Sequence, residues 1–155
     1  MLTDPVYPDA KRTTVFSEGI EFQDFVCEQL AKENIILQNL SSKKYQFKIG
    51  ENLQGFEIKL DNLCTETGRL SIEVAEKFKA ENFDWIKSGI YRNDNSWLYI
   101  HGNYKIIFIF AKNLLQGLHK SRKYEYAETP TVKKFYLPIL DAKKYAAKWI
   151  EYGMD

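Results

Sequence analysis

The stretch of residues 55–77, GFEIKLDNLCTETGRLSIEVAEK, contains two short runs in which apolar and charged side chains alternate. In the first run, Glu57, Lys59 and Asp61 alternate with three apolar residues. In the second run, residues 70–75, apolar residues again recur at every second position, and Glu73 lies between two of them. A period of two puts all the polar side chains of a strand on one face. The stretch therefore predicts two half-buried strands that form a hairpin across the linker NLCTETGR.

Patterns on both sides of this stretch predict the other elements. Apolar residues at helical spacing predict an amphipathic helix capped by Ser17. Alternating, β-branched and aromatic runs predict a strand over residues 43–49, a hairpin over residues 96–111 with the turn HGN, and a strand over residues 133–140. Residues 112–121 are expected to form a short helix. Residues 141–152 are expected to form a closing helix, with Asp141 as its N-cap and Gly153 just past its end.

The run IIFIFA at residues 106–111 indicates how the sheet is covered. It is apolar at consecutive positions, so both faces of this strand must be buried. With the order of helices and strands, this predicts an α/β (α+β) fold in which helices flank a central mixed β-sheet. A chain of 155 residues suits one hydrophobic core. We expect an N-terminal arm at residues 1–14 and a single domain at residues 15–155.

The composition of the chain indicates an ordinary globular protein. The chain is 45% hydrophobic and 28% charged, as globular proteins are. No apolar run approaches the roughly 20 residues of a membrane span, and the polar start lacks a secretory hydrophobic region, so we expect a cytoplasmic protein without a membrane partner. Cys27 and Cys64 lack the spacing of a disulfide framework or zinc site. The net charge is +1, and the clusters HKSRK (residues 119–123) and VKK (residues 132–134) either form a basic patch or belong to solvated surface.

The charged faces of the predicted hairpin have two interpretations. In the first, they are the solvated side of a sheet, where acids and lysines pair across strands. In the second, the carboxylates of Glu57, Asp61 and Glu73 hold a hard divalent cation such as Mg²⁺, and a neighbouring lysine contacts a phosphate group. Spacing alone leaves both interpretations open.

The order of motifs along the chain resembles the PD-(D/E)XK, or restriction-endonuclease-like, nucleases, especially small phage-type and resolvase-like members. The segment EGIEFQDFVCEQL is similar to the first helix of that family, and GFEIKLD with TGRLSIEVAEK is similar to its catalytic hairpin. KSGIYRNDNSWLYI and YKIIFIF are similar to the segments that follow. The resemblance implies a restriction-endonuclease-like fold and hydrolysis of DNA, or alternatively RNA, with water as nucleophile and Mg²⁺ or Mn²⁺ as cofactor. A homodimer would address both strands of a duplex.

The resemblance also implies roles for individual residues. Glu73 matches the acid of the (Asp/Glu)-x-Lys element, and Asp61 or Glu57 matches the preceding acid, so these three are the expected metal ligands. Ala75 stands where the motif has its lysine, and either Lys77 or Lys59 would take over that role. In the first helix, Glu21 would either support the metal site or be a solvated acid at the positive end of the helix dipole. Three residues of the loop that follows, Lys87, Ser88 and Arg92, would bind substrate.

Ala75 also supports a different function. A chain that has lost the catalytic lysine would be a nucleic-acid-binding module, or a non-catalytic partner subunit, with the same fold. A third interpretation, an interaction domain with a solvated charged sheet, is favoured by the near-zero net charge.

Overall fold

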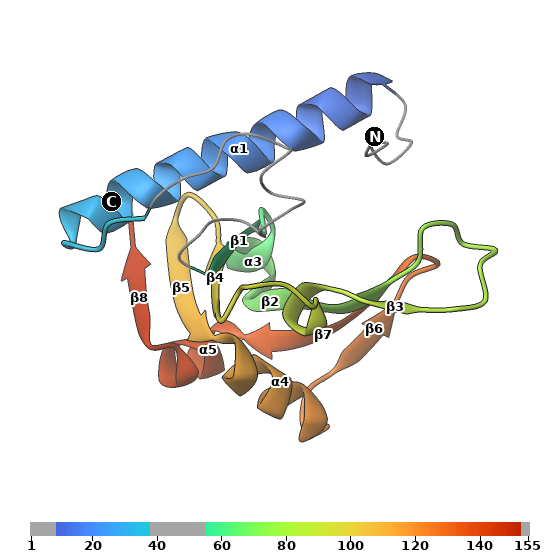
Figure 1. Ribbon diagram of the computed structural model, residues 1–155. Coiled ribbons are helices and arrows are strands. Elements are labelled where there is room, and N and C mark those ends of the chain that lie inside the picture. The colour runs from blue at the N-terminus through green and yellow to red at the C-terminus, as the bar shows by residue number, and fades with distance from the viewer. Residues whose placement is uncertain (1–8, 38–54, 153–155) are drawn as a thin grey trace.

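In the computed structural model, the described residues are 9–37 and 55–152, and side chains are described from residue 17 onward. The first element is α1 (Asp9–Lys32), a long helix that crosses one side of the molecule (Figure 1). The predicted helix is confirmed, but it begins before Ser17, which therefore lies inside the helix and does not cap it. Residues 9–14 of the expected arm are likewise helical. The strand predicted over residues 43–49 lies outside the described residues.

The described strands form two four-stranded sheets. The first sheet has the order β1-β4-β5-β8, formed by β1 (Phe56–Leu60), β4 (Leu98–Gly102), β5 (Ile106–Ala111) and β8 (Lys148–Glu151). β1 pairs with β4 in parallel, while the β4–β5 and β5–β8 pairs are antiparallel. The predicted hairpin over residues 96–111 is confirmed as β4 and β5, but its turn lies at residues 103–105, because His101 and Gly102 of the predicted turn HGN still belong to β4.

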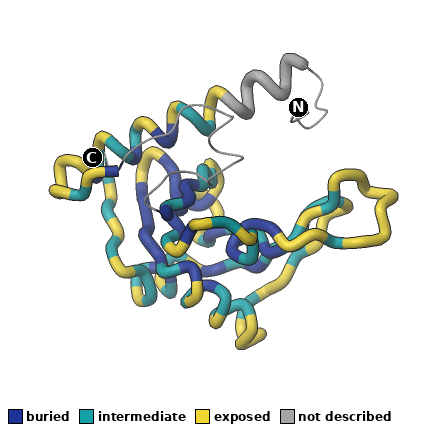
Figure 2. The backbone as a smooth tube through the Cα atoms, in the orientation of Figure 1, coloured by how far each residue is buried: buried dark blue, intermediate teal, exposed yellow. Residues whose placement is uncertain are grey.

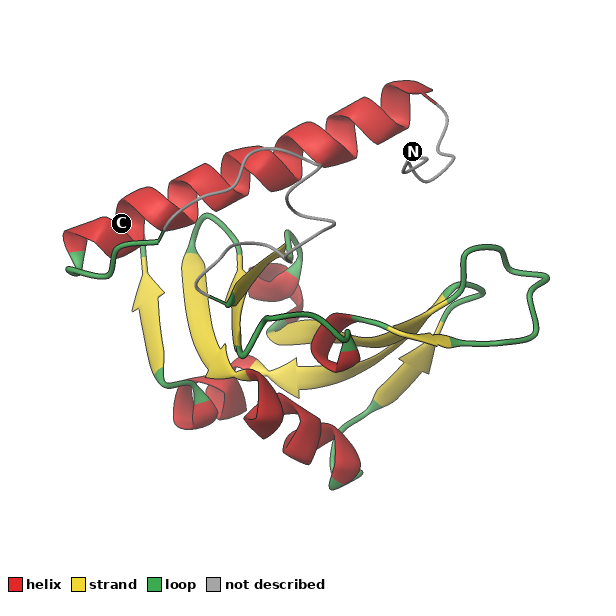
Figure 3. Ribbon diagram, in the orientation of Figure 1, coloured by secondary structure: helices red, strands yellow, loops and turns green. Residues whose placement is uncertain are grey.

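The second sheet is wholly antiparallel, with the order β3-β2-β7-β6. It is formed by β3 (Ile86–Lys87), β2 (Arg69–Glu76), β7 (Val132–Pro138) and β6 (Tyr126–Glu128). The segment between β2 and β3 projects from the body of the molecule and is mostly exposed (Figure 2). The short helices are α3 (Cys64–Thr67), α4 (Lys112–Lys120) and α5 (Ile139–Tyr145), and η1 (Gly89–Tyr91) is a 3₁₀ turn (Figure 3).

The predicted hairpin of residues 56–61 and 70–75 is wrong. β1 belongs to the first sheet, where Ile58 pairs with Ile100, and β2 belongs to the second. The linker folds into α3, which ends at Gly68 in the left-handed conformation (φ 75°), with the Gly68 N–H donating to the Cys64 carbonyl. A helical connection replaces the tight turn that a hairpin needs, so β1 is free to pair with a strand from elsewhere in the chain.

The predicted closing helix is also wrong beyond its first turns. α5 begins at Ile139, so Asp141 lies in its first turn instead of capping it, and the chain then forms β8. β8 pairs with β5 from Ile109↔Lys148 to Ile106↔Glu151. An unpaired edge beside an apolar strand is unfavourable, and this pairing outweighs the helical spacing of residues 148–152.

The expected burial of β5 on both faces is confirmed. Ile107 and Ile109 pack with α1, where Phe22, Val26 and Leu30 are buried. The other side chains of β5, Phe108 and Phe110 among them, pack in a second cluster with β2, β7, α4 and α5. The α+β fold class is thereby confirmed, but two packed sheets replace the single central sheet. Within the described residues, no helix is both long and apolar enough to cross a membrane.

Candidate functional site

Asp61 follows β1 and is engaged in structural hydrogen bonds. Its Oδ2 accepts from the backbone N–H of Ser71 at 2.9 Å and from Nε2 of His101 at 2.8 Å. Burial alone would raise the pKa of Asp61, but the hydrogen bond and charge of His101, with backbone N–H donors, hold it below its ordinary value. One oxygen of this carboxylate thus joins the first sheet to the start of β2, and both of its hydrogen bonds are internal to the fold.

Glu57 was expected on an exposed face, but its side chain has no exposed surface. Three cations surround the carboxylate: Lys59 Nζ lies 3.4 Å from Oε1, Lys112 Nζ lies 3.8 Å from Oε2 and Arg92 Nη1 lies 4.0 Å from Oε1. Lys112 also donates to Asp94 Oδ1 at 3.2 Å and to the Arg92 carbonyl at 3.1 Å. A buried carboxylate is stable only with such counter-charges, so Glu57 ties β1 to α4 and to the segment after η1.

Glu73 is half-buried on β2, near a second acid that sequence reasoning missed. Burial and the charge of Glu73 raise the pKa of Glu76, while Lys59 and Arg92 act in the opposite direction. Glu73, Glu76, Lys59 and Arg92 therefore share one electrostatic environment. Glu76 joins this group because of a β-bulge in β2. The alternation of residues in the sequence does not reveal that bulge, so Glu76 was missed.

A β-bulge interrupts the alternation of β2. Glu73 pairs with Lys134 and Ala75 pairs with Lys133, so Val74 is the extra residue between them. As a result, the consecutive residues Val74 and Ala75 both line the same pocket, and beyond the bulge the alternation is shifted by one position. Glu76 then interacts with Glu73, whereas Lys77 lies over the ring of Trp85, with Nζ 4.6 Å from its centroid. Lys77 therefore does not share a face with Glu73, and Lys59 is the lysine on the side of the acids.

The remaining predicted site residues are dispersed. Glu21 is exposed on α1, where its charge adds to burial in raising the pKa of Tyr104. Ser88 is buried, and its backbone N–H donates to Val74. Arg92 belongs to the Glu57 cluster, while Lys87 lines the pocket. Nowhere in residues 17–37 and 55–152 do three His, Cys, Asp or Glu side chains gather to hold a metal ion. The structure thus does not bring the predicted ligands Asp61, Glu73 and Glu57 together in one such group.

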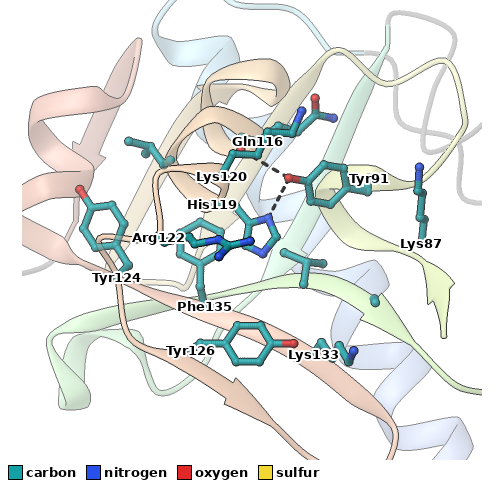
Figure 4. Close-up of a pocket in the computed structure, with 13 residues that line it drawn as sticks. Lys87, Tyr91, Gln116, His119, Lys120, Arg122, Tyr124, Tyr126, Lys133 and Phe135 are labelled. Carbon is teal, nitrogen blue, oxygen red and sulfur yellow. Dashed lines mark hydrogen bonds between the residues drawn. The ribbon is translucent and has the colours of Figure 1, made fainter.

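A pocket of about 860 Å³ lies between α4 and the second sheet (Figure 4). Its walls come from β2, β3, β6, β7, η1, α4 and the segment after α4. Four cationic side chains line it: Lys87, Lys120, Arg122 and Lys133. Five aromatic rings do so as well, those of Tyr91, His119, Tyr124, Tyr126 and Phe135. None of the described lining residues is acidic.

Hydrogen bonds and ring contacts hold the aromatic residues of the pocket in place. The Tyr91 hydroxyl lies 2.8 Å from Nδ1 of His119, and its ring meets the imidazole edge to face at 5.3 Å (Figure 4). The imidazole in turn packs against Phe135, which forms part of the floor. The Tyr124 hydroxyl donates to Asp141 at 2.9 Å, and burial and that carboxylate raise the pKa of Tyr124 to about 12. Tyr126 is half exposed at the rim.

The cations of the pocket are largely free of counter-charges. Of the four, Lys133 makes an ion pair with the exposed Glu128 at 3.7 Å, and the described part of the chain supplies no such partner for Lys87, Lys120 or Arg122. Burial and the charges of Lys120 and Arg122 lower the pKa of His119 below its ordinary value, so its imidazole is neutral near pH 7. The pocket presents positive charge and aromatic surface to the same ligand.

Sequence reasoning found parts of this pocket but did not assemble them. The clusters at residues 119–123 and 132–134 were expected either to form a basic patch or to belong to solvated surface. The fold brings them together on opposite walls of the pocket. Tyr124 and Tyr126 were missed. Tyr126 lies in β6, which is too short to give a strand pattern, and Tyr124 lies in the segment between α4 and β6.

In comparisons with known proteins, no family model matches the chain, and neither a curated protein nor a solved structure matches it.

Proposed function

We propose that this protein binds a single strand of nucleic acid in the pocket between α4 and the second sheet. The observation that carries the proposal is the lining of the pocket, with four cations, five aromatic rings and no acid among its described residues. Lysine and arginine bind phosphate groups, and aromatic rings stack on bases that are not paired. Bases of an intact duplex are stacked on one another, so a recessed aromatic surface favours an unpaired strand. This is the binding-module function that Ala75 supports.

Binding of a fluorescently labelled oligo(dT) across a salt series tests the proposal. If all four cations contact phosphates, the slope of log K against log salt concentration should be about −3, at about 0.7 per phosphate for a single strand. The double variant Lys120→Gln/Arg122→Gln should bind at least about tenfold more weakly at 0.1 M salt, with a shallower slope. Lys105→Gln is the matched control, since Lys105 is an exposed lysine on the turn between β4 and β5, outside the pocket.

The outcomes separate the ligand classes. Equal affinity of the double variant and the control for oligo(dT) would show that the pocket is not part of the binding site. Tighter binding of a duplex than of the single strand would contradict stacking of unpaired bases in the pocket.

Metal-dependent hydrolysis of the bound strand is a second candidate function. It is favoured by the shared environment of Glu73, Glu76, Lys59 and Arg92, which combines two acids with two cations. Mg²⁺ often takes only one or two carboxylates and completes its coordination with water and phosphate oxygens. Glu73 and Glu76 are the residues that would hold such an ion.

Cleavage of labelled linear, branched and single-stranded DNA with Mg²⁺, Mn²⁺ or EDTA tests the second function. Cleavage that needs metal and is lost in Glu73→Ala and Glu76→Gln would support it. A folded protein that binds the strand but cuts none of these substrates with either metal would be a binding module alone.

A further inference from the structure

We infer that the wall of the pocket formed by β3, β2 and β7 contains a subsite for one phosphate group, located over Ala75 between Lys87 and Lys133. The inference rests on the proposed function, because it identifies which part of a nucleic-acid strand this wall binds. It also gives Ala75 a role of its own in place of the lysine that the nuclease motif has at this position.

The pairing register places the three residues side by side. Ala75 is the direct partner of Lys87 in β3 and of Lys133 in β7. Directly paired residues of antiparallel strands project to the same side of a sheet with their Cβ atoms about 5 Å apart. All three residues line the pocket. Two lysines thus flank Ala75 on the side of the sheet that faces the pocket, and the side chain of Ala75 is only a methyl group.

The bulge at Val74 is what turns Ala75 toward the pocket. In a regular strand, Ala75 would share a face with Glu73, away from Val74. Because Val74 is the extra residue, Val74 and Ala75 both face the pocket, and Glu73 remains on the side of Lys59 and Arg92. Bulges commonly redirect a side chain beside a functional site. Here the redirected residue is Ala75, the smallest of the three paired residues Lys87, Ala75 and Lys133.

The two lysines lack sufficient counter-charge of their own. Like charges on neighbouring strands repel each other, which is unfavourable unless an anion lies between them. Lys133 has Glu128 at 3.7 Å and the ring of Trp85 at 4.6 Å from its Nζ, both of which hold it at the edge of the pocket. Lys87 is exposed, and no carboxylate of the described residues pairs with it. A phosphate, with several acceptor oxygens, accepts hydrogen bonds from both ammonium groups at once.

The neighbouring aromatic residues indicate a phosphate that belongs to a nucleotide. Phe135 lies two residues from Lys133 on β7, about 7 Å along the strand and on the same face. Tyr126 pairs directly with Phe135 and also lines the pocket. A phosphate at Ala75 therefore has an aromatic surface beside it, at a distance that one nucleotide spans from its phosphate to its base.

Substitutions at position 75 test the subsite while both lysines stay in place. Ala75→Glu introduces a carboxylate between the lysines, and Ala75→Gln introduces the same volume without charge. With labelled oligo(dT) of about 12 nucleotides as the probe, Ala75→Glu should bind at least about tenfold more weakly than Ala75→Gln, with a salt slope shallower by about 0.7. Thermal unfolding of both variants checks that they are folded.

Substitutions of the flanking residues test the subsite without altering the packing of Ala75. If Lys87 and Lys133 hold one phosphate together, the double variant Lys87→Gln/Lys133→Gln should lose about 0.7 in salt slope, whereas two separate phosphate contacts would lose about 1.4. Glu128→Gln removes the acid that competes for Lys133 and should strengthen binding by about twofold, an effect that loss of a structural ion pair would not produce.

The failures of the two proposals are distinguishable. If the natural protein binds no oligonucleotide, the proposed function fails. Suppose that the natural protein binds, but Ala75→Glu and Ala75→Gln have equal affinity for oligo(dT), or the salt slope of Lys87→Gln/Lys133→Gln falls by about 1.4. The shared phosphate subsite is then refuted, and binding in the pocket stands.

Discussion

Asp61 links the two sheets, since its Oδ2 accepts hydrogen bonds from both Ser71 and His101. We expect Asp61→Asn to lower the free energy of unfolding at pH 7 by about 1–3 kcal/mol, because two part-buried donors lose a charged acceptor. Urea unfolding measures the loss. The exposed Glu66→Gln on α3 is the control, with an expected change within about 0.5 kcal/mol.

The same substitution has a predictable pH dependence. Since the folded-state pKa of Asp61 lies below its ordinary value of 3.8, its stabilising effect is complete above that value and is lost as the pH falls through the folded-state pKa. The stabilities of Asp61→Asn and the natural protein should therefore converge in acid. A difference that stays constant from pH 7 to about pH 3 would mean that the charge of Asp61 does not stabilise the fold.

His119 gives the pocket its own pH dependence. Its imidazole faces Tyr91, Lys120, Arg122 and Phe135, and its pKa lies below the ordinary 6.5. A bound phosphate favours the protonated form, so affinity for oligo(dT) should rise as the pH falls from 7 toward 5. His119→Gln should bind with an affinity that changes little over that range. An equal pH response in both proteins would assign the effect to another group.

Glu57 shows which residue-level features a sequence does not reveal. Its charge and its alternation with apolar neighbours predict exposure, yet Arg92 and Lys112 approach from distant parts of the chain and allow its burial. Local periodicity contains no information about such partners, so the metal-ligand role inferred for Glu57 could not be tested from spacing.

At the scale of elements, η1 packs closely against β2. Gly89 has a positive φ of 54°, and a Cβ there would collide with the carbonyl group and side chain of Glu73. Gly89→Ala should therefore lower the free energy of unfolding by at least about 1–3 kcal/mol. Gly117→Ala is the matched control, because a Cβ at that position in α4 meets nothing within 4 Å and should stabilise the helix by about 1 kcal/mol. Chemical denaturation of both variants measures the two opposite shifts, and stabilisation by Gly89→Ala would contradict the close packing.

The sequence predicted long elements well and irregular ones poorly. α1, α4, β4, β5 and β7 follow clear patterns, and β1 and β2 are present where alternation predicted them. The bulge at Val74 was not predictable, because a single inserted residue leaves the spacing of Glu73 and Lys77 unchanged along the chain while reversing their faces. That one irregularity decides which lysine accompanies the acids.

At the scale of the whole molecule, the assignment of strands to sheets was the step that the sequence could not supply. Proximity along the chain favours a hairpin of β1 and β2, but β1 pairs with β4 and β2 with β7. The pocket depends on the pairing of β2 with β7, since its cations come from β3, the α4 region and β7. Basic clusters were visible in the sequence, whereas their meeting depends on the order of strands in the second sheet.

The pairing of β8 with β5 has a consequence for synthesis of the protein. A ribosome makes residues 106–111 well before residues 148–151, so β5 emerges and pairs with β4 while its other edge is still open. Until β8 arrives, the growing polypeptide presents an unpaired, strongly apolar strand, the kind of surface on which nascent chains associate with one another. Premature termination just before residue 148 would therefore yield a fragment that aggregates, although most of both hydrophobic clusters would already have been synthesised.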